Sequence, residues 1–396
     1  MIREIQLSAF KCFAERDIPC RPLTLLTGFN GGGKSTVLQA LLLLHQVFAD
    51  GIENAALRRT LPLNGSLVSL GSLRDVVDKV HGGYGFSIGV SADAVAVRWA
   101  FKSQESSREA LAVPVERVSW IVGDVHGQSP VEEPAVLVPA ELRSILSATD
   151  LLRALGALRY VPADRIGPEQ TYPLEEPQQH EVLGPRGERA VGSLFAHSDL
   201  GVEQQLRHPS RLDTITFPRQ VEAWLADLFP GAVIEVQKVT NANLVTLGIR
   251  TNNATDLHRP QHVGFGMTYV LPVLVALLSS RKGDIVIIEN PEAHLHPRAQ
   301  ARIGALCARA AAAGVQVIVE THSDHVLNGI RVAVHRGEVQ TEDVMVLFFS
   351  PQREEPVQAL KIDRRGRIAY WPQGFFDESE RLLEALLEPV KTPGGE

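Results

Sequence analysis

Residues 28–36 of this 396-residue chain read GFNGGGKST and match the P-loop spacing G-x-x-x-x-G-K-[ST] without a mismatch. The run LTLLT before the motif is apolar and β-branched, as in a buried strand, and residues 37–44 form an unbroken helix-forming stretch after it. A P-loop requires this order of strand, glycine-rich loop and helix. The motif therefore predicts an α/β fold of the P-loop NTPase type.

The residue types in the loop suit the binding of a triphosphate. Three consecutive glycines leave backbone N–H groups open to phosphate oxygens, and the helix that follows points its positive end at them. Lys34 has the length to reach the β- and γ-oxygens, and Ser35 offers a hydroxyl to Mg²⁺. The predicted cofactor-binding residues of the loop are Asn30, Gly31, Gly32, Gly33, Lys34, Ser35 and Thr36.

Composition limits the classes of partner. The net charge of -7 and the pI near 6.0 give no global attraction to nucleic acid, although a local basic patch is left open. The three cysteines form no C-x-x-C pair, which fits a reducing cytosol and argues against a zinc hook. The N-terminus is too polar for a signal peptide, and the apolar runs are too short to cross a bilayer. We expect a cytoplasmic protein without a membrane partner.

The chain is longer than one core usually needs, and we expect a single head of three parts. These are an N-terminal lobe with the P-loop and an antiparallel β subdomain (1–130), a helical and β insertion (131–260) and a C-terminal lobe (261–396). Residues 83–103 and 115–123 alternate as antiparallel strands do, residues 140–158 favour a helix, and residues 233–239 and 244–250 are typical of a hairpin.

Two later segments combine a buried strand with polar residues at its end. In DIVIIENPEAHLHP (284–297), four apolar residues lead to Glu289, as in a parallel strand that delivers a carboxylate to its carboxyl edge. Beside a P-loop, Glu289 is expected to hold Mg²⁺ directly or through water, together with Ser35. VQVIVETHSDHVLNGI (315–330) repeats the pattern and places Glu320, Thr321 and His322 at the end of a strand.

With these motifs, the chain resembles the ABC-type chromosome and repair ATPases of the RecF, SMC and OLD (overcoming lysogenization defect) group. The cluster Phe10-Lys11-Cys12-Phe13 is similar to a phrase on their first strands. The resemblance implies a mainly parallel core sheet with an antiparallel lobe. It also implies that two ATP molecules lie between two heads in a head-to-tail homodimer. The absence of heptads argues against a long coiled-coil arm, and too few residues follow His322 for the nuclease domain of OLD nucleases.

The resemblance assigns roles in the second half of the site. Residues 261–280 resemble the signature loop of the OLD-like variant, with Gly264 and Gly266 just ahead of a helix. Gly266 and Thr268 are then expected to face the γ-phosphate held by the opposite protomer. Tyr269 stands where glutamine is commoner, and the LSGGQ phrase of transporters is missing. His322 matches the switch histidine that contacts the γ-phosphate.

The acid that polarises the attacking water departs from the usual pattern. Most ABC-type ATPases place a glutamate directly after the magnesium-binding acid, and here Asn290 occupies that position. An amide cannot accept the proton. Glu292, the second acid of the family phrase E-n-P-E-a-H-L-H-P, is the candidate base. We expect ATP hydrolysis that is slow, or that depends on Glu292.

Several residues have two interpretations. Lys11 is either close to the nucleotide or a partner, or an ordinary surface lysine. Arg165 either contacts phosphate or a partner, or forms a structural ion pair with Asp164 or a neighbouring acid. His294 and His296 are assigned to the loop that crosses to the partner protomer rather than to zinc.

The C-terminal end WPQGFFD (371–377) resembles the tail of a bacterial subfamily of these ATPases that lacks a nuclease domain. We expect its aromatic residues to pack on the core. Residues 360–371 are expected to form a hairpin that turns at Gly366.

Three functions fit the sequence. The first is the ATPase of a bacterial antiviral defence system that acts on a separate effector such as a nuclease or toxin. The second is a DNA repair or recombination accessory that clamps DNA ends, and the third is a non-hydrolysing, ATP-gated scaffold. Oligomers larger than the dimer and a nucleic-acid partner are left open.

Overall fold

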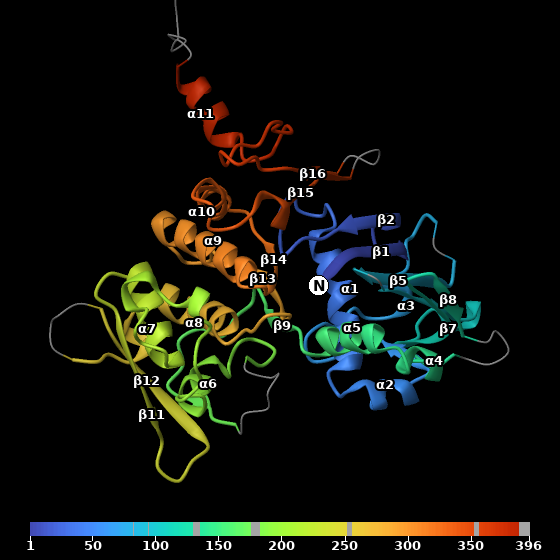
Figure 1. Ribbon diagram of the computed structural model, residues 1–396, viewed down its shortest axis with the longest axis horizontal. Helices are drawn as coiled ribbons and strands as arrows, with labels where there is room; N and C mark the ends of the chain where they lie inside the picture. The colour runs from blue at the N-terminus through green and yellow to red at the C-terminus, as the bar shows by residue number, and fades with distance from the viewer. Residues whose placement is uncertain are drawn as a thin grey trace, which may run out of the picture.

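The computed structural model describes residues 1–81, 83–93, 95–129, 135–175, 183–251, 256–351 and 356–387. Figure 1 shows an N-terminal lobe on one side, a group of helices with a long hairpin on the other, and a C-terminal helix that projects from the body. Strands of the core sheet connect the two sides. Within the described residues, no helix has both the length and the apolar character needed to cross a membrane.

The core is a six-stranded sheet in which every neighbouring pair is parallel except the pair at one edge. Its central strands are almost entirely buried because helices cover both faces. This result confirms the mainly parallel core sheet. In spatial order the strands are β16 (Val357–Leu360), β15 (Val344–Phe349), β3 (Leu23–Gly28), β14 (Gln316–Glu320), β13 (Ile285–Glu289) and β9 (Arg159–Val161).

A separate antiparallel sheet forms most of the N-terminal lobe, as expected from the alternating residues. Its strands follow the order β2 (Phe13–Pro19), β1 (Ile2–Phe10), β5 (Gly85–Ala92), β6 (Val95–Lys102), β7 (Ala112–Val122) and β4 (Thr60–Pro62), and β8 (Val125–Gln128) also pairs with β7. The turn from β1 to β2 contains Lys11 and Cys12, and Phe10 pairs with Phe13 across it.

Helix α1 (Lys34–Phe48) lies between the two sheets and is apolar on nearly every side. Its leucines share one hydrophobic cluster with residues from both sheets. Helix α5 (Leu146–Gly156) packs on α1, so a segment expected in the insertion belongs to the N-terminal lobe. The expected helix over 140–158 is divided, because Ile145 is extended between α4 (Ala140–Arg143) and α5. Two short helices, α2 (Ile52–Leu57) and α3 (Leu73–Val76), complete this lobe.

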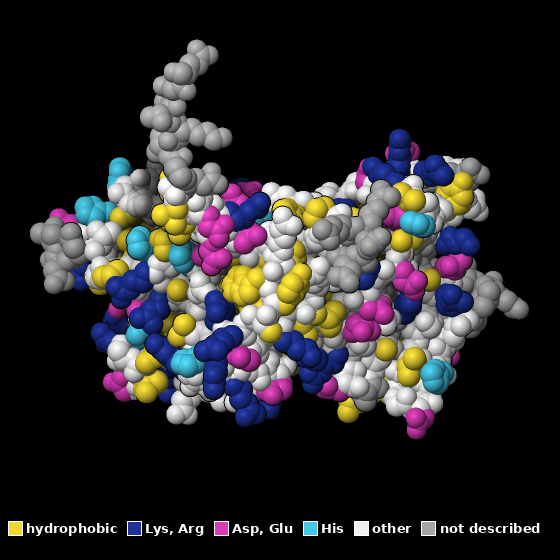
Figure 2. All heavy atoms as spheres, turned by 90° about the horizontal axis from the view of Figure 1, so that it is seen from above, with side chains coloured by type: hydrophobic (Ala, Val, Ile, Leu, Met, Phe, Trp, Pro, Cys, Tyr) yellow, Lys and Arg dark blue, Asp and Glu magenta, His cyan; other side chains and the backbone are white. Residues whose placement is uncertain are grey.

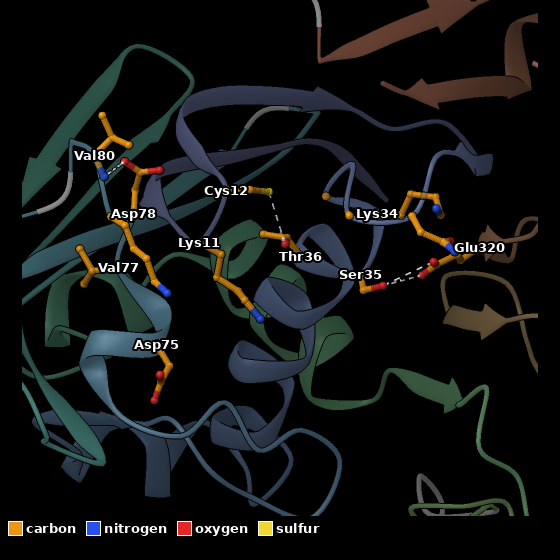
Figure 3. Close-up of a pocket in the computed structure, with 14 residues that line it drawn as sticks. Lys11, Cys12, Lys34, Ser35, Thr36, Asp75, Val77, Asp78, Val80 and Glu320 are labelled. Atoms are coloured by element: carbon orange, nitrogen blue, oxygen red, sulfur yellow. Dashed lines mark hydrogen bonds between the residues drawn. The ribbon is translucent and has the colours of Figure 1, made fainter. Parts of the chain in front are cut away.

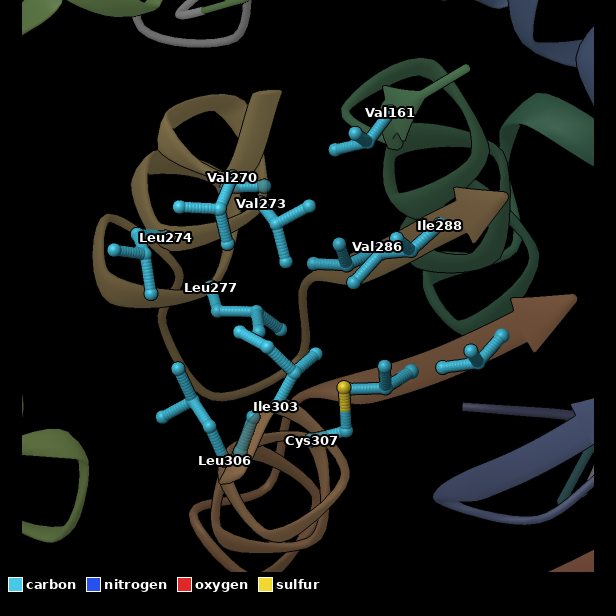
Figure 4. Close-up of a cluster of buried hydrophobic side chains, with 14 of the residues drawn as sticks. Val161, Val270, Val273, Leu274, Leu277, Val286, Ile288, Ile303, Leu306 and Cys307 are labelled. Carbon is cyan, nitrogen blue, oxygen red and sulfur yellow. The ribbon is translucent and has the colours of Figure 1, made fainter. Parts of the chain in front are cut away.

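The opposite face of the core sheet is covered by α8 (Phe265–Leu278), α9 (Pro297–Ala312) and α10 (Asp324–His335). In Figure 4, valine and leucine side chains of α8 point toward Val286 and Ile288 of β13, and Ile303 and Leu306 of α9 close the same cluster. Helix α8 is hydrophobic all round, which suits a helix enclosed in a core. This packing sets the position of the loop that precedes α8.

The inserted part contains a three-stranded antiparallel sheet in the order β10 (Tyr172–Pro173), β12 (Leu244–Arg250) and β11 (Val233–Lys238), with α6 (Ala190–Ala196) and α7 (Phe217–Leu228) beside it. The expected hairpin is thus confirmed. Short 3-10 helices lie at Glu105–Ser107, Gln204–Leu206, Pro209–Arg211, Pro260–His262 and Thr341–Asp343.

After β16, the chain turns at Gly366, where a single bridge joins Ile362 and Ile368 instead of the expected longer hairpin. Of the tail aromatics, Phe375 packs on the core as expected: its ring lies 5.6 Å from the Phe348 ring and is 1% exposed. Trp371 is 42% exposed, so the expectation is wrong for this residue. The helix that follows, α11 (Glu378–Leu387), was not expected, and it projects from the body in Figure 1.

Candidate functional site

The P-loop joins β3 to α1 at the carboxyl edge of the core sheet, where ligands bind in open α/β sheets. Two of its glycines are required by their surroundings. Gly28 has φ 123°, and a Cβ there would lie 2.1 Å from the Phe349 carbonyl oxygen. Gly33 has φ 105°, and its Cβ would lie 2.5 Å from the Phe13 ring. The loop therefore passes tightly between β15 and the β1–β2 turn.

Lys34 begins α1 and is buried. Its Nζ donates hydrogen bonds of 3.0 Å to the carbonyl oxygens of Gly28 and Phe29. Burial lowers the pKa of this ammonium, and Glu320 opposes the shift. The cation thus lies against the loop.

A cavity of about 430 Å³ opens beside the loop. Asn30, Gly31, Gly33, Lys34, Ser35 and Thr36 line it, while Gly32 is buried against Phe349. In Figure 3, Lys11 extends into this space from the β1–β2 turn, and its Nζ bonds Gln39 Oε1 at 2.7 Å. Of the two interpretations of Lys11, the structure favours the one that places it near the P-loop, because Lys11 lines the same cavity as Lys34 and Ser35. The rest of the cavity is lined by Asp75, Val77, Asp78, Lys79 and Val80.

Two carboxylates lie at the ends of neighbouring strands. Glu289 ends β13, Glu320 ends β14, and the two residues pair in register. Glu289 Oε1 accepts a 2.9 Å hydrogen bond from Tyr160, whereas both carboxylate oxygens of Glu320 lie 3.3–3.4 Å from Ser35 Oγ. Burial raises the pKa of Glu289, and it raises the pKa of Glu320 to about 7 with help from the Glu289 charge.

Glu320 was not assigned a role in the sequence analysis. The sequence contained the signal, because Glu320 follows four apolar residues in the same way as Glu289. Only the arrangement of the strands shows which of the two acids faces the P-loop serine.

Asn290 lies in a tight turn directly after β13. Its φ is 44°, and its N–H donates a 2.8 Å hydrogen bond to the Glu320 carbonyl oxygen. Asparagine tolerates this left-handed conformation better than most residues. The residue thus has a structural reason to be an amide, independent of the chemistry expected at this position.

Arg165 has a structural place rather than a phosphate contact, although its hydrogen bonds go to carbonyl oxygens and not to Asp164. Its guanidinium is 1% exposed and donates to the carbonyl oxygens of Glu289 at 3.0 Å and Asn290 at 2.7 Å. The expected partner Asp164 instead pairs with Arg186. A buried guanidinium needs acceptors, and the turn after β13 leaves two carbonyl oxygens for it.

Glu292 links this turn to the two residues that follow β14, Thr321 and His322. Its Oε2 accepts a 2.7 Å hydrogen bond from Thr321 Oγ1, and its Oε1 accepts a 2.8 Å bond from the His322 N–H. The pKa of His322 is lowered by burial and by the Lys34 charge. Its side chain lines a second cavity of about 520 Å³, together with Asn30 of the P-loop and Gly374 and Phe376 of the tail.

The signature residues are placed differently from the expectation. Gly264 is the exposed N-cap of α8, whereas Gly266 lies inside the helix and packs against the His294 carbonyl oxygen. Thr268 is 5% exposed, and its hydroxyl donates to the Phe265 carbonyl oxygen. The phosphate-facing roles assigned to Gly266 and Thr268 do not match this placement, because the first turn of α8 encloses both. Gly264 and Phe265 are the residues presented to the surface.

The two histidines of the loop have separate contacts. His294 packs its ring against Tyr269 at 4.7 Å between centroids, and His296 caps α9 by accepting from the Arg298 N–H. The two rings thus take part in local packing and capping.

The sheet that carries the P-loop and the strand-end acids has the fold of an ABC-type ATPase head. An SMC head bound to the C-terminal winged-helix domain of ScpA superposes with a TM-score of 0.53 at 15% identity, covering 92% of this chain and 98% of that one. An SMC head with an extended coiled coil, bound to the C-terminal domain of ScpA derived from Pyrococcus furiosus, gives a TM-score of 0.51 at 13% identity, covering 98% and 99%. At these identities the likeness shows the fold alone.

The chain belongs to the AAA domain family described as putative AbiEii toxin, type IV toxin–antitoxin system, which matches residues 23–328. Residues 339–386 match a family described as a protein of unknown function (DUF3696). An OLD nuclease of Thermus scotoductus is 42% identical over 41 residues. That match covers 10% of this chain and 8% of the nuclease.

Proposed function

We propose that this chain is a dimeric, ATP-driven switch that serves as the ATPase and sensor subunit of a bacterial antiviral defence system. The main support is the convergence of the P-loop, the acids of β13 and β14, and His322 at one sheet edge. The family description, which names a putative toxin, and the local match to an OLD nuclease favour defence. The effector would be a separate protein such as a nuclease or toxin.

The chain's own residues account for nucleotide binding. Lys34 exchanges its two carbonyl partners for β- and γ-phosphate oxygens, and the loop N–H groups hold the remaining oxygens. Ser35 and the carboxylates of β13 and β14 form an oxygen-rich set that suits Mg²⁺. When bound, Mg²⁺ supplies positive charge that stabilises the transferring phosphoryl group.

Glu292 is the proposed base because Asn290 cannot accept a proton. Its two carboxylate oxygens each accept one hydrogen bond, which leaves lone pairs for a water molecule. The same bonds attach Glu292 to the segment that contains His322. The base and the switch histidine would therefore move together when the γ-phosphate is lost.

The placement of α8 supports a dimer. No residue of α8 is among those that line the P-loop cavity, within the part of the chain described. The exposed N-terminus of α8 is therefore available to the phosphates of a second copy, in the head-to-tail arrangement. Higher oligomers could be built from this dimer.

Steady-state phosphate release with Mg-ATP tests the proposal. Lys34→Ala should abolish ATP binding and turnover, and Glu292→Gln should abolish turnover while ATP binding and dimerisation, followed by light scattering, are retained. A wild-type protein that binds ATP and dimerises without turnover would support the ATP-gated scaffold. A wild-type protein that does not bind ATP would refute the proposal.

The DNA repair alternative has a weaker basis. On the face in Figure 2, basic side chains are interspersed with acidic ones and with hydrophobic patches, which is typical of a solvated surface. DNA binding that requires ATP and weakens with salt would favour this alternative. Loss of phage protection on deletion of either this gene or a neighbouring nuclease or toxin gene would favour defence.

A further inference from the structure

A third cavity, of about 510 Å³, lies between the N-terminal lobe and the inserted part of the chain. Its walls come from the carboxyl end of α1, from residues 58–67, from the start of β9 and from residues 183–189. Among the described residues it shares no lining residue with the P-loop cavity, which lies at the opposite end of α1. Its volume is in the range of pockets that hold small molecules.

Positive side chains predominate among the charged groups of this cavity. Three guanidinium groups line it, those of Arg58, Arg159 and Arg189, whereas Asp50 is the one carboxylate among the described lining residues. Asp50 pairs with Arg58 at 3.0 Å, and the carboxylates that pair with the other two arginines lie outside the lining. The surplus of guanidinium groups favours a negatively charged ligand.

Two of these guanidinium groups have N–H donors that no described residue accepts. The Arg58 side chain donates to Asp50 through Nη2 alone. Arg159 is 7% exposed and donates to Ser280 and Asp284 through Nη1 alone, and its Nε is buried without a partner. Oxygens of an acidic group are strong acceptors for such donors, because the hydrogen bond is assisted by both charges.

Most of the remaining wall is apolar, and it is formed by Pro62, Leu67, Leu158, Leu183 and Pro185. Apolar walls with a few convergent polar groups are the usual form of a small-molecule site. We propose that this cavity binds a small organic anion, whose apolar body lies on these walls and whose acidic group binds Arg58 and Arg159. This binding is separate from the proposed nucleotide binding.

The cavity has a direct connection to the nucleotide site through β9, which lies between the two sides of the molecule in Figure 1. Tyr160 lines the cavity, and its hydroxyl donates to Glu289 at the end of β13. Arg159 pairs with Asp284, the residue before β13 begins. An occupant of the cavity therefore contacts the strand that holds both ends of β13, and the anion is an effector of nucleotide binding. This second part rests on the proposed ATP binding.

Anilinonaphthalene sulfonate is a suitable probe, because it combines aromatic rings with one acidic group and fluoresces when it is bound. Its uncharged parent, phenylnaphthylamine, has the same rings without the sulfonate. Titration of the full chain without nucleotide should show a saturable site that binds the sulfonate at least about tenfold more tightly than the parent, as for a charge-assisted contact.

Three variants locate the site. Arg58→Gln should weaken binding of the sulfonate at least about threefold, and Ala49→Phe, which places a ring at an exposed position of the lining, should eliminate the saturable site. Arg143→Gln is the matched control and should stay within about twofold of the wild type. Arg143 is as exposed as Arg58 and also forms a 3.0 Å ion pair, with Glu53, but it does not line the cavity. Thermal unfolding verifies that all three variants fold.

The binding site is refuted if Arg58→Gln and Ala49→Phe bind the sulfonate as the wild type does, if Arg143→Gln loses as much affinity as Arg58→Gln, or if the parent binds equally well. A non-hydrolysable ATP analogue with Mg²⁺ tests the connection. It should change the affinity for the sulfonate at least about threefold in the wild type, because coupling between two sites is reciprocal. An unchanged affinity with the analogue bound would refute the effector role. A wild type that binds no analogue would refute the proposed function and the effector role, but not the anion site.

Discussion

Thr321 donates a 2.7 Å hydrogen bond from its hydroxyl to the carboxylate of Glu292, and this bond joins the loop after β13 to the end of β14. Thr321 is fully buried and also accepts from the Ser323 N–H. The bond therefore holds the proposed base against the segment that contains the switch histidine. Its removal should affect catalysis more than nucleotide binding.

Thr321→Val should reduce ATP turnover at least about tenfold and lower the free energy of unfolding by roughly 1–2 kcal/mol, since it removes one buried donor without changing the side-chain shape much. Affinity for ATP should stay within about threefold of the wild type. Phosphate release and denaturant titration are the measurements. Thr321→Ser keeps the hydroxyl and should retain most of the turnover, and equal losses in both variants would contradict the role of the bond.

Gly33→Ala should eliminate ATP binding and lower the free energy of unfolding by roughly 2–4 kcal/mol, because the new Cβ would meet the Phe13 ring and Cys12 Sγ at a left-handed φ. Gly31→Ala is the matched control in the same loop. The φ of Gly31 is also positive, but no atom lies within 4 Å of the position that its Cβ would take. Gly31→Ala should therefore lower the free energy of unfolding by only about 1–2 kcal/mol. Urea titration of both variants compares them, and equal destabilisation would show that the contact with Phe13 is unimportant.

Arg165→Met should lower the free energy of unfolding by roughly 2–4 kcal/mol, because two carbonyl oxygens lose a buried, charged donor. Arg165→Lys should recover only part of this loss, since one ammonium cannot reproduce the planar pair of donors. Arg186→Met is the control: its pairing with Asp164 is exposed and should contribute about 0–1 kcal/mol. Chemical denaturation of the three variants measures the free energy of unfolding of each. Similar losses in Arg165→Met and Arg186→Met would refute the structural role of Arg165.

The metal-free protein should lose stability as pH rises from about 4.5 to about 7. The pKa of Glu320 is raised to about 7 in the folded state by burial and by Glu289, so between these values the folded state binds more protons than the unfolded state. The free energy of unfolding is therefore highest below the pKa that Glu320 has in the unfolded state. It declines until the pH passes the pKa of Glu320 in the folded state. Thermal unfolding in EDTA across this range should show the decline, and Glu320→Gln should flatten it. An identical pH profile in the wild type and in Glu320→Gln would show that Glu320 is not the group whose raised pKa causes the decline.

The mainly parallel core, the antiparallel lobe and the strands β3, β13, β14 and β15 could be predicted from the sequence because each carries a strong local signal. Strands buried on both faces are continuous apolar runs, and the alternating residues of β5 to β7 indicate a sheet with one face packed on α1. Helix α11 was missed, and the hairpin at Gly366 was overestimated. The hairpin error lies in a short segment that turns at Gly366, whereas α11 projects from the body and buries none of its side chains, so contacts within the molecule do not explain that error.

The sequence by itself determined the P-loop, because Gly28, Gly33, Lys34 and Ser35 act through local backbone conformation and helix start. It also placed Glu289, Glu292, Glu320 and His322 near one sheet edge, since strand ends can be recognised from apolar runs. Only the tertiary structure decided which partner each side chain takes. Ser35 faces Glu320 because β14, and not β13, lies next to β3. Arg165 is buried where the carbonyl oxygens of Glu289 and Asn290 accept from its guanidinium. Strand order and burial depend on contacts between residues more than 100 positions apart, which no local pattern contains.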